Sequence, residues 1–165
     1  MSPHQRRQRI AIGLSAAGAL LLAMHPLPAD FLHARPEWLS LLVVYWVLRA
    51  PLEVGMGSAW LLGLLFDGLT GGPLGAHALA LSVVAYVVLA LRARILHWSL
   101  FQQVLVVGGC AALGQFLCHW AQGLAGHPAP DASFLVASLT TAACWPIVGM
   151  QFGPGGRAGA WDAAS

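Results

Sequence analysis

Apolar residues gather in six runs along the chain, separated by short segments that hold most of the charged, proline and glycine residues. An α-helix needs about 20 apolar residues to cross a bilayer, with a usual range of about 17–25. The fifth and sixth runs reach that length, and the first, third and fourth reach it when flanking residues are included. The pattern therefore predicts six membrane-spanning helices over Ile10–Met24, Trp38–Leu48, Val54–Leu69, Ala76–Leu91, Leu100–Trp120 and Phe134–Phe152.

The second run is the shortest, and a proline stands on each side of it. Pro36 precedes it and Pro51 follows it. Proline suits the first turn of a helix or a position beyond its end better than the middle of a helix. Merging this run with the third would also bury Arg49 and Glu53 in hydrocarbon. We therefore expect a short but separate span.

The arginines test this topology independently, because cytoplasmic loops of membrane proteins are enriched in basic residues. With the N-terminus inside, Arg35 alone lies on the outer side. The other seven arginines lie inside: Arg6, Arg7, Arg9, Arg49, Arg92, Arg94 and Arg157. A five-span chain would put Arg157 outside. We expect two cytoplasmic termini, a single membrane domain over 1–152 and a disordered cytoplasmic tail over 153–165.

A cleavable signal peptide is an alternative for the first run, because Arg6, Arg7 and Arg9 precede an apolar stretch. Cleavage sites prefer a small residue three positions before the cut. Leu27, in Leu27-Pro28-Ala29, is not small. Removal of this helix would also upset the charge pattern, so we expect the helix to be retained.

The composition excludes several classes of protein. Of the 165 residues, 58% are hydrophobic and 8% are charged, whereas a soluble domain carries about 25% charged residues. The net charge of +2 gives no field that would attract nucleic acid. A soluble enzyme, a nucleic-acid binder and a disordered regulator are excluded. The three cysteines lie in apolar runs without CxxC spacing, so we expect them to pack in the core.

Small residues recur at four-residue spacing on three predicted helices, the pattern by which helices pack closely in lipid. Two interpretations stay open, namely packing within the chain and contact with a partner's helix. The rows are Ala11, Ser15, Ala19 and Ala23 on the first helix, Gly55, Ala59 and Gly63 on the third, and Cys110, Gly114 and Cys118 on the fifth.

Asp67 lies near the end of the third predicted helix, just before a stretch broken by glycine and proline. An acid at a helix C-terminus opposes the helix dipole, and a carboxylate close to hydrocarbon needs a partner. One interpretation is an acid solvated at the membrane interface. The other is the charged floor of an outward pocket, formed with Gly71 and Gly75 and paired with Arg35 or His77.

The fifth predicted helix carries a polar row, Gln115, His119 and Gln122, that faces one direction. These groups would be costly against lipid, so we expect hydrogen bonds between helices, a polar cavity or a partner-facing seam. Gln102 and Gln103 are predicted to lie at the membrane interface. An interfacial aromatic belt is predicted from Trp38, Trp98, Trp120 and Trp145.

Catalytic and metal sites are not indicated. Asp67 and Asp131 could form an aspartyl dyad only if their carboxyl groups shared a proton. Asp131 lies in a proline-rich loop that better resembles the start of the sixth helix. The seven histidines show neither HxxxH nor HExxH spacing. We expect no enzymatic activity, no metal and no cofactor.

A series of short motifs, in order from the arginine-rich start to about residue 150, resembles the MreD family of bacterial cell-elongation proteins. The motifs are Arg35-Pro36-Glu37-Trp38, Tyr45-Trp46-Val47-Leu48, Ala50-Pro51, Val54-Gly55, Gly57, Leu62-Gly63, Phe66-Asp67-Gly68-Leu69, Gly71, Leu74-Gly75, His77-Ala78-Leu79-Ala80, Ala85-Tyr86, Gln102-Gln103-Val104-Leu105-Val106-Val107, Trp120 and Trp145-Pro146.

The resemblance implies a non-enzymatic, multi-pass scaffold of the bacterial inner membrane. Its implied partners are MreC by direct contact, and MreB, RodA and RodA's penicillin-binding transpeptidase in the same complex. That complex directs side-wall peptidoglycan synthesis and maintains rod shape. A homo-oligomer is compatible with this role, and nucleic acid is not an expected partner.

The family fold is similar to the six-helix substrate-binding subunit of energy-coupling-factor vitamin transporters. That similarity keeps a second function in view, a membrane subunit that binds a small molecule. Two features depart from the family pattern. An acid often found on the fifth span is Gln115 here, and the C-terminal tail is glycine-rich rather than basic.

Overall fold

The computed structural model describes residues 3–25, 35–126 and 134–149, and within these ranges the chain is helical, without a strand. Each predicted apolar run coincides with one helix, so the predicted all-α class is confirmed. The first helix begins earlier than predicted. The helices are α1 (Pro3–Met24), α2 (Trp38–Arg49), α3 (Met56–Thr70), α4 (Ala76–Ile95), α5 (Leu100–Leu124) and α6 (Phe134–Gly149).

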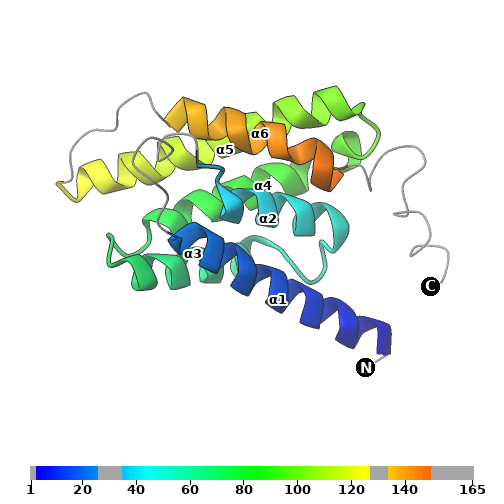
Figure 1. The fold of residues 1–165 in the computed structure, drawn as a ribbon, viewed down its shortest axis with the longest axis horizontal. Helices are drawn as coiled ribbons and strands as arrows, with labels where there is room; N and C mark the ends of the chain where they lie inside the picture. The colour runs from blue at the N-terminus through cyan, green and yellow to red at the C-terminus, as the bar shows by residue number, and fades with distance from the viewer. Residues whose placement is uncertain (1–2, 26–34, 127–133, 150–165) are drawn as a thin grey trace.

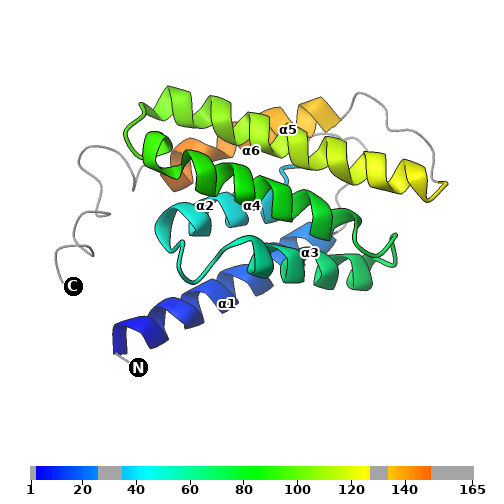
Figure 2. The ribbon, with the colours of Figure 1, turned by 180° about the vertical axis from the view of Figure 1, so that it is seen from behind.

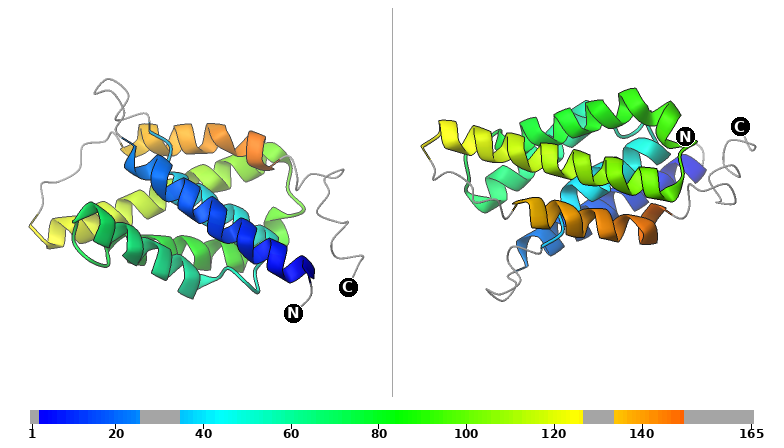
Figure 3. Two further views of the ribbon diagram at one scale, coloured as in Figure 1. Left: turned by 60° about the horizontal axis from the view of Figure 1, so that its bottom comes forward. Right: turned by 90° about the horizontal axis from the view of Figure 1, so that it is seen from above.

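The helices form two layers of three. One layer holds α6, α2 and α1, and the other holds α5, α4 and α3 (Figures 1 and 2). α1 crosses the bundle obliquely and contacts α2 and part of α3 (Figure 3). The start of α1 and the end of α6 lie at one end of the bundle. The turn between α3 and α4 lies at the other end, called here the α3–α4 end (Figure 1).

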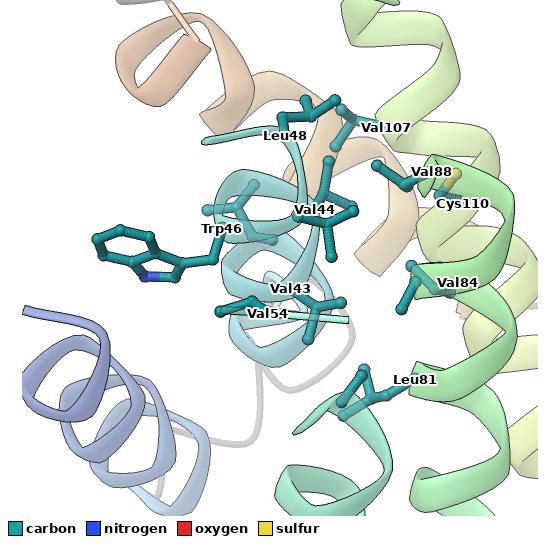
Figure 4. Close-up of a cluster of buried hydrophobic side chains, with 14 of the residues drawn as sticks. Val43, Val44, Trp46, Leu48, Val54, Leu81, Val84, Val88, Val107 and Cys110 are labelled. Atoms are coloured by element: carbon teal, nitrogen blue, oxygen red, sulfur yellow. The ribbon is translucent and has the colours of Figure 1, made fainter. Parts of the chain in front are cut away.

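The short helix α2 lies at the centre of the bundle and contacts α1, α4, α5 and α6. Its side chains Val43, Val44 and Leu48 point towards α4 and α5 (Figure 4). They pack there against Leu81, Val84, Val88, Val107 and Cys110. Lipid already solvates apolar side chains, so close van der Waals contact is the main force in such a core. This location explains why α2 can be shorter than a bilayer-spanning helix.

Among the described helices, α4 and α5 are long and apolar enough to cross a bilayer, and α2, α3 and the described part of α6 are shorter apolar helices. Large apolar side chains are exposed around the bundle, with Leu14, Leu61, Phe101 and Leu139 each more than 60% exposed. A surface of this kind suits lipid better than water. The count of six spans stays a prediction.

Two side chains predicted to lie at the membrane interface are buried instead. Trp145 is 0% exposed and Gln103 is 1% exposed. The indole N–H of Trp145 donates to Oε1 of Gln103 over 3.2 Å, and Nε2 of Gln103 donates to the carbonyls of Ile95 and Trp98. Buried polar groups need such partners. These contacts tie α6 to α5 and to the end of α4, so the interfacial prediction was wrong for both residues.

Candidate functional site

Asp67 of α3 caps the start of α4. Its carboxylate accepts a 2.8 Å hydrogen bond from the backbone N–H of Gly75 and a 3.2 Å bond from that of His77. The first N–H groups of a helix have no partner within it and carry partial positive charge. Gly75, the N-cap residue of α4, has no side chain to serve them. The dipole of α4 therefore favours the carboxylate that the dipole of α3 disfavours.

The backbone between α3 and α4 is built so that Asp67 can reach this position. Gly71 ends α3 with φ of 69° and Gly75 begins α4 with φ of 99°, both in the left-handed region that glycine adopts without strain. A Cβ added to Gly63 would lie 2.5 Å from Cα of Ala78. The absent side chain lets the two helices touch, which brings the last turn of α3 against the first turn of α4.

His77 is the side-chain partner of Asp67. Its Nδ1 lies 2.6 Å from Oδ1 of Asp67, and its ring meets the ring of Phe66 edge to face at 4.8 Å between centroids. The sequence suggested Arg35 as another partner. The guanidinium of Arg35 instead donates to the carbonyl of Leu22 over 2.8 Å, near the end of α1. Asp67 is 1% exposed, so it is not an acid solvated at the interface.

A pocket of about 270 Å³ opens at the α3–α4 end. The polar row predicted on α5, Gln115, His119 and Gln122, lines one side of it. The remaining lining comes from the end of α1, the segment that leads into α2, the end of α3, the start of α4 and one further α5 residue: Ala23, Arg35, Pro36, Glu37, Trp38, Leu39, Phe66, His77 and Cys118. This pocket is what the small-molecule-binding alternative requires.

Glu37 is the residue of this pocket that the sequence did not single out. It lies directly before α2, at the N-cap position, and its backbone N–H donates to Oγ1 of Thr141 on α6 over 2.7 Å. Its Oε2 is buried and has no hydrogen-bond partner in the described parts of the chain. Burial raises the pKa of the carboxyl to about 7, and the side chains of Ser40 and Gln115 lower the pKa by a smaller amount. The sequence feature that could have identified Glu37 is its position between Pro36 and Trp38, at the predicted start of a helix.

Most of the small-residue positions pack within the chain. Gly63 contacts α4, Ala59 is 1% exposed, and a Cβ on Gly114 would lie 3.1 Å from Cγ2 of Val84. Gly55 requires a correction, because it is the N-cap residue of α3 and a Cβ there would meet nothing within 4 Å. Its N–H donates to Oγ of Ser58, so Gly55 belongs to the cap at the start of α3 and does not pack two helices together.

The catalytic and metal alternatives receive no support from the described ranges. Asp131, the second acid of the dyad hypothesis, lies outside them. Within them, no group of three or more histidine, cysteine, aspartate or glutamate side chains is arranged to hold a metal ion. The pocket offers hydrogen-bonding groups and aromatic side chains to a ligand.

Comparison with known proteins connects the whole bundle to one family. Residues 5–150 match the family described as rod shape-determining protein MreD. The chain is also 41% identical over 90 residues to the rod shape-determining protein MreD of Haemophilus influenzae, an alignment that covers 54% of this chain and 56% of that relative. The chain thus spans about half the length of the curated relative it matches. No solved structure matches it.

Proposed function

The chain belongs to the MreD family of rod shape-determining proteins, and from this premise we propose that it is a non-enzymatic scaffold of the bacterial cell-elongation complex. In this proposal it crosses the inner membrane six times, with both termini in the cytoplasm. It binds MreC directly and works with MreB, RodA and RodA's penicillin-binding transpeptidase. Together they direct side-wall peptidoglycan synthesis and maintain rod shape.

The observation that carries the proposal is the extent of the family match. It covers residues 5–150, which include nearly all of the six described helices. A match to the entire bundle supports a role for the bundle as a unit. The apolar exterior of the bundle supports a place in the membrane, where a partner would meet it through helix contacts.

The outward face of α1 is our candidate for the contact with MreC. Two residues of the predicted row on α1 face inward, because Ser15 Oγ accepts a 2.8 Å bond from Nε1 of Trp46 and Ala19 is 7% exposed. Gly13 and Ala17, four residues apart, lie exposed on another face. A Cβ on Gly13 would meet nothing within 4 Å. A single helix of a partner could approach closely there.

Co-purification tests both parts of the proposal. The tagged chain is extracted from membranes that also contain MreC, and the recovered MreC is quantified. We expect Gly13→Leu to reduce recovery about tenfold, since loss of close helix packing costs on the order of 1–2 kcal/mol. Gly109→Leu is the matched control, because Gly109 is an exposed, uncontacted glycine on α5.

Two results would count against the proposal in different ways. Absence of MreC from the wild-type preparation would refute the direct contact. Equal recovery with Gly13→Leu and Gly109→Leu would refute the choice of α1 as the contact face, and leave the direct contact standing.

A further inference from the structure

The pocket at the α3–α4 end has a chemistry that the scaffold role does not use. Its volume of about 270 Å³ lies close to the lower limit of the about 300–1,000 Å³ typical of ligand pockets. It is lined by polar groups from α5, from the segment before α2 and from the start of α4. The kind of ligand that fits depends on which of these groups donate hydrogen bonds and which accept them.

The Asp67–His77 pair fixes the hydrogen-bonding character of the His77 ring. The Asp67 carboxylate already accepts from two backbone N–H groups, and it also faces Nδ1 of His77 at 2.6 Å. A carboxylate that accepts these bonds requires the proton on Nδ1. In the neutral ring, Nε2 then carries a lone pair and can only accept. His77 lines the pocket with its side chain 24% exposed.

Glu37 adds a second acceptor to the same pocket. Its Oε2 has no hydrogen-bond partner among the described residues. A buried acceptor without a partner costs roughly 1–3 kcal/mol, and more when it is charged. A ligand that donates a hydrogen bond to this carboxylate would remove that cost.

Three side chains of the pocket that carry N–H groups each have one acceptor among the described residues. The guanidinium of Arg35 donates to the carbonyl of Leu22, and Nε2 of Gln122 donates to Sγ of Cys118 over 3.4 Å. Nδ1 of His119 lies 2.8 Å from the carbonyl of Gln115, which can only accept. The aromatic side chains of Trp38 and Phe66 are also part of the lining, and an aromatic ring attracts a cation through its π face.

We propose that this pocket binds an organic ammonium group, with the Glu37 carboxylate and Nε2 of His77 as acceptors and with Trp38 and Phe66 as aromatic walls. The ammonium group is a compact donor of three hydrogen bonds and carries the charge that complements the carboxylate. A small amine and a lysine side chain of another chain present the same group. The proposal does not depend on the scaffold role.

Binding to the purified full-length chain in detergent tests the proposal without any partner protein. The probes are n-butylammonium, a lysine with both its α-amino and carboxyl groups blocked, and the neutral 1-pentanol. Tryptophan fluorescence follows the titration, because Trp38 lines the pocket. We expect saturable binding of at least one of the two ammonium probes and none of 1-pentanol. Preference for n-butylammonium identifies a small amine as the ligand, and preference for blocked lysine identifies a lysine side chain.

Glu37→Gln and Glu53→Gln provide the matched pair of variants. Glu37→Gln should weaken ammonium binding about tenfold or more, the loss expected for one hydrogen bond to a charged group. Glu53 forms its ion pair with Arg9, away from the pocket, so Glu53→Gln should bind as the wild type does. Failure of both ammonium probes to saturate the wild-type chain would overturn the proposal. So would equal affinity of the two variants, or binding of 1-pentanol as tight as that of n-butylammonium.

Discussion

Asp67 lies in the last turn of α3, yet its carboxylate serves the start of α4, where it accepts the backbone N–H of Gly75 over 2.8 Å. The two residues belong to opposite sides of a tight turn. Their bond places a negative charge at the positive end of α4 and holds that turn closed. The same carboxylate orients the ring of His77 beside the pocket.

Substitution of Asp67 should therefore destabilise the bundle. In Asp67→Ala the N–H groups of Gly75 and His77 and Nδ1 of His77 lose their common acceptor. We expect a loss of about 2–4 kcal/mol, combining a lost helix cap with unpaired buried donors. Asp67→Asn keeps one acceptor oxygen and should lose about half as much. Thermal unfolding in detergent measures both variants, and equal unfolding temperatures for Ala and Asn would contradict the capping role.

Gly63 should not tolerate a side chain, whereas Gly68 on the same helix should. A Cβ at Gly63 would lie 2.5 Å from backbone atoms of Ala78, and one at Gly68 would meet nothing within 4 Å. We expect Gly63→Ala to lower the stability by about 1–3 kcal/mol, as overpacking does. Gly68→Ala should raise stability by up to about 1 kcal/mol through helix propensity. The two unfolding temperatures check this, and a loss in both variants would argue against the close contact.

The hydrophobic pattern alone located each described helix, because each apolar run is long enough for a helix and is bounded by segments that hold charged, proline and glycine residues. The same pattern indicated that Asp67 needs a partner, because a carboxylate at the end of α3 is disfavoured by the dipole of that helix. The sequence of α3 does not show that Asp67 caps α4. The Asp67 carboxylate and the N–H groups that it accepts are separated by a turn, and the geometry of that turn depends on Gly71 and Gly75.

Other residues could not be placed because their position depends on packing between distant segments. Gln103 and Trp145 both lie near the ends of predicted spans, where polar and aromatic residues usually meet the membrane interface. Only the contact between α5 and α6 turns them towards each other. Glu37 was overlooked for the same reason, since its burial depends on the approach of α5 and α6 to the start of α2.

Gln103 and Trp145 should be energetically coupled. The hydrogen bond between Trp145 Nε1 and Gln103 Oε1 is buried and joins residues from two helices. We expect a double-mutant cycle of Gln103→Leu and Trp145→Phe to give an interaction energy of about 1 kcal/mol, typical of a direct contact. Unfolding of the two single variants and the double variant measures it. Strict additivity would show that the bond contributes nothing to stability.

Glu37 should make the stability of the bundle depend on pH. Burial raises the pKa of this carboxyl from its ordinary 4.5 to about 7, so the folded state holds the proton more tightly than the unfolded chain does. The stability that this proton provides is fully present below pH 4.5 and is lost as the pH rises through 7. The difference of roughly two and a half pKa units corresponds to about 3 kcal/mol.

The comparison with Glu37→Gln isolates this contribution from that of the histidines. Glutamine carries no titratable proton, so the variant should lack this part of the pH dependence and gain on the wild type as the pH rises from 4.5 to above 7. Unfolding temperatures of both proteins in detergent, taken across this range, give the difference directly. Parallel profiles for the two proteins would show that Glu37 is already ionised in the folded bundle, and would contradict its burial beside Ser40 and Gly114.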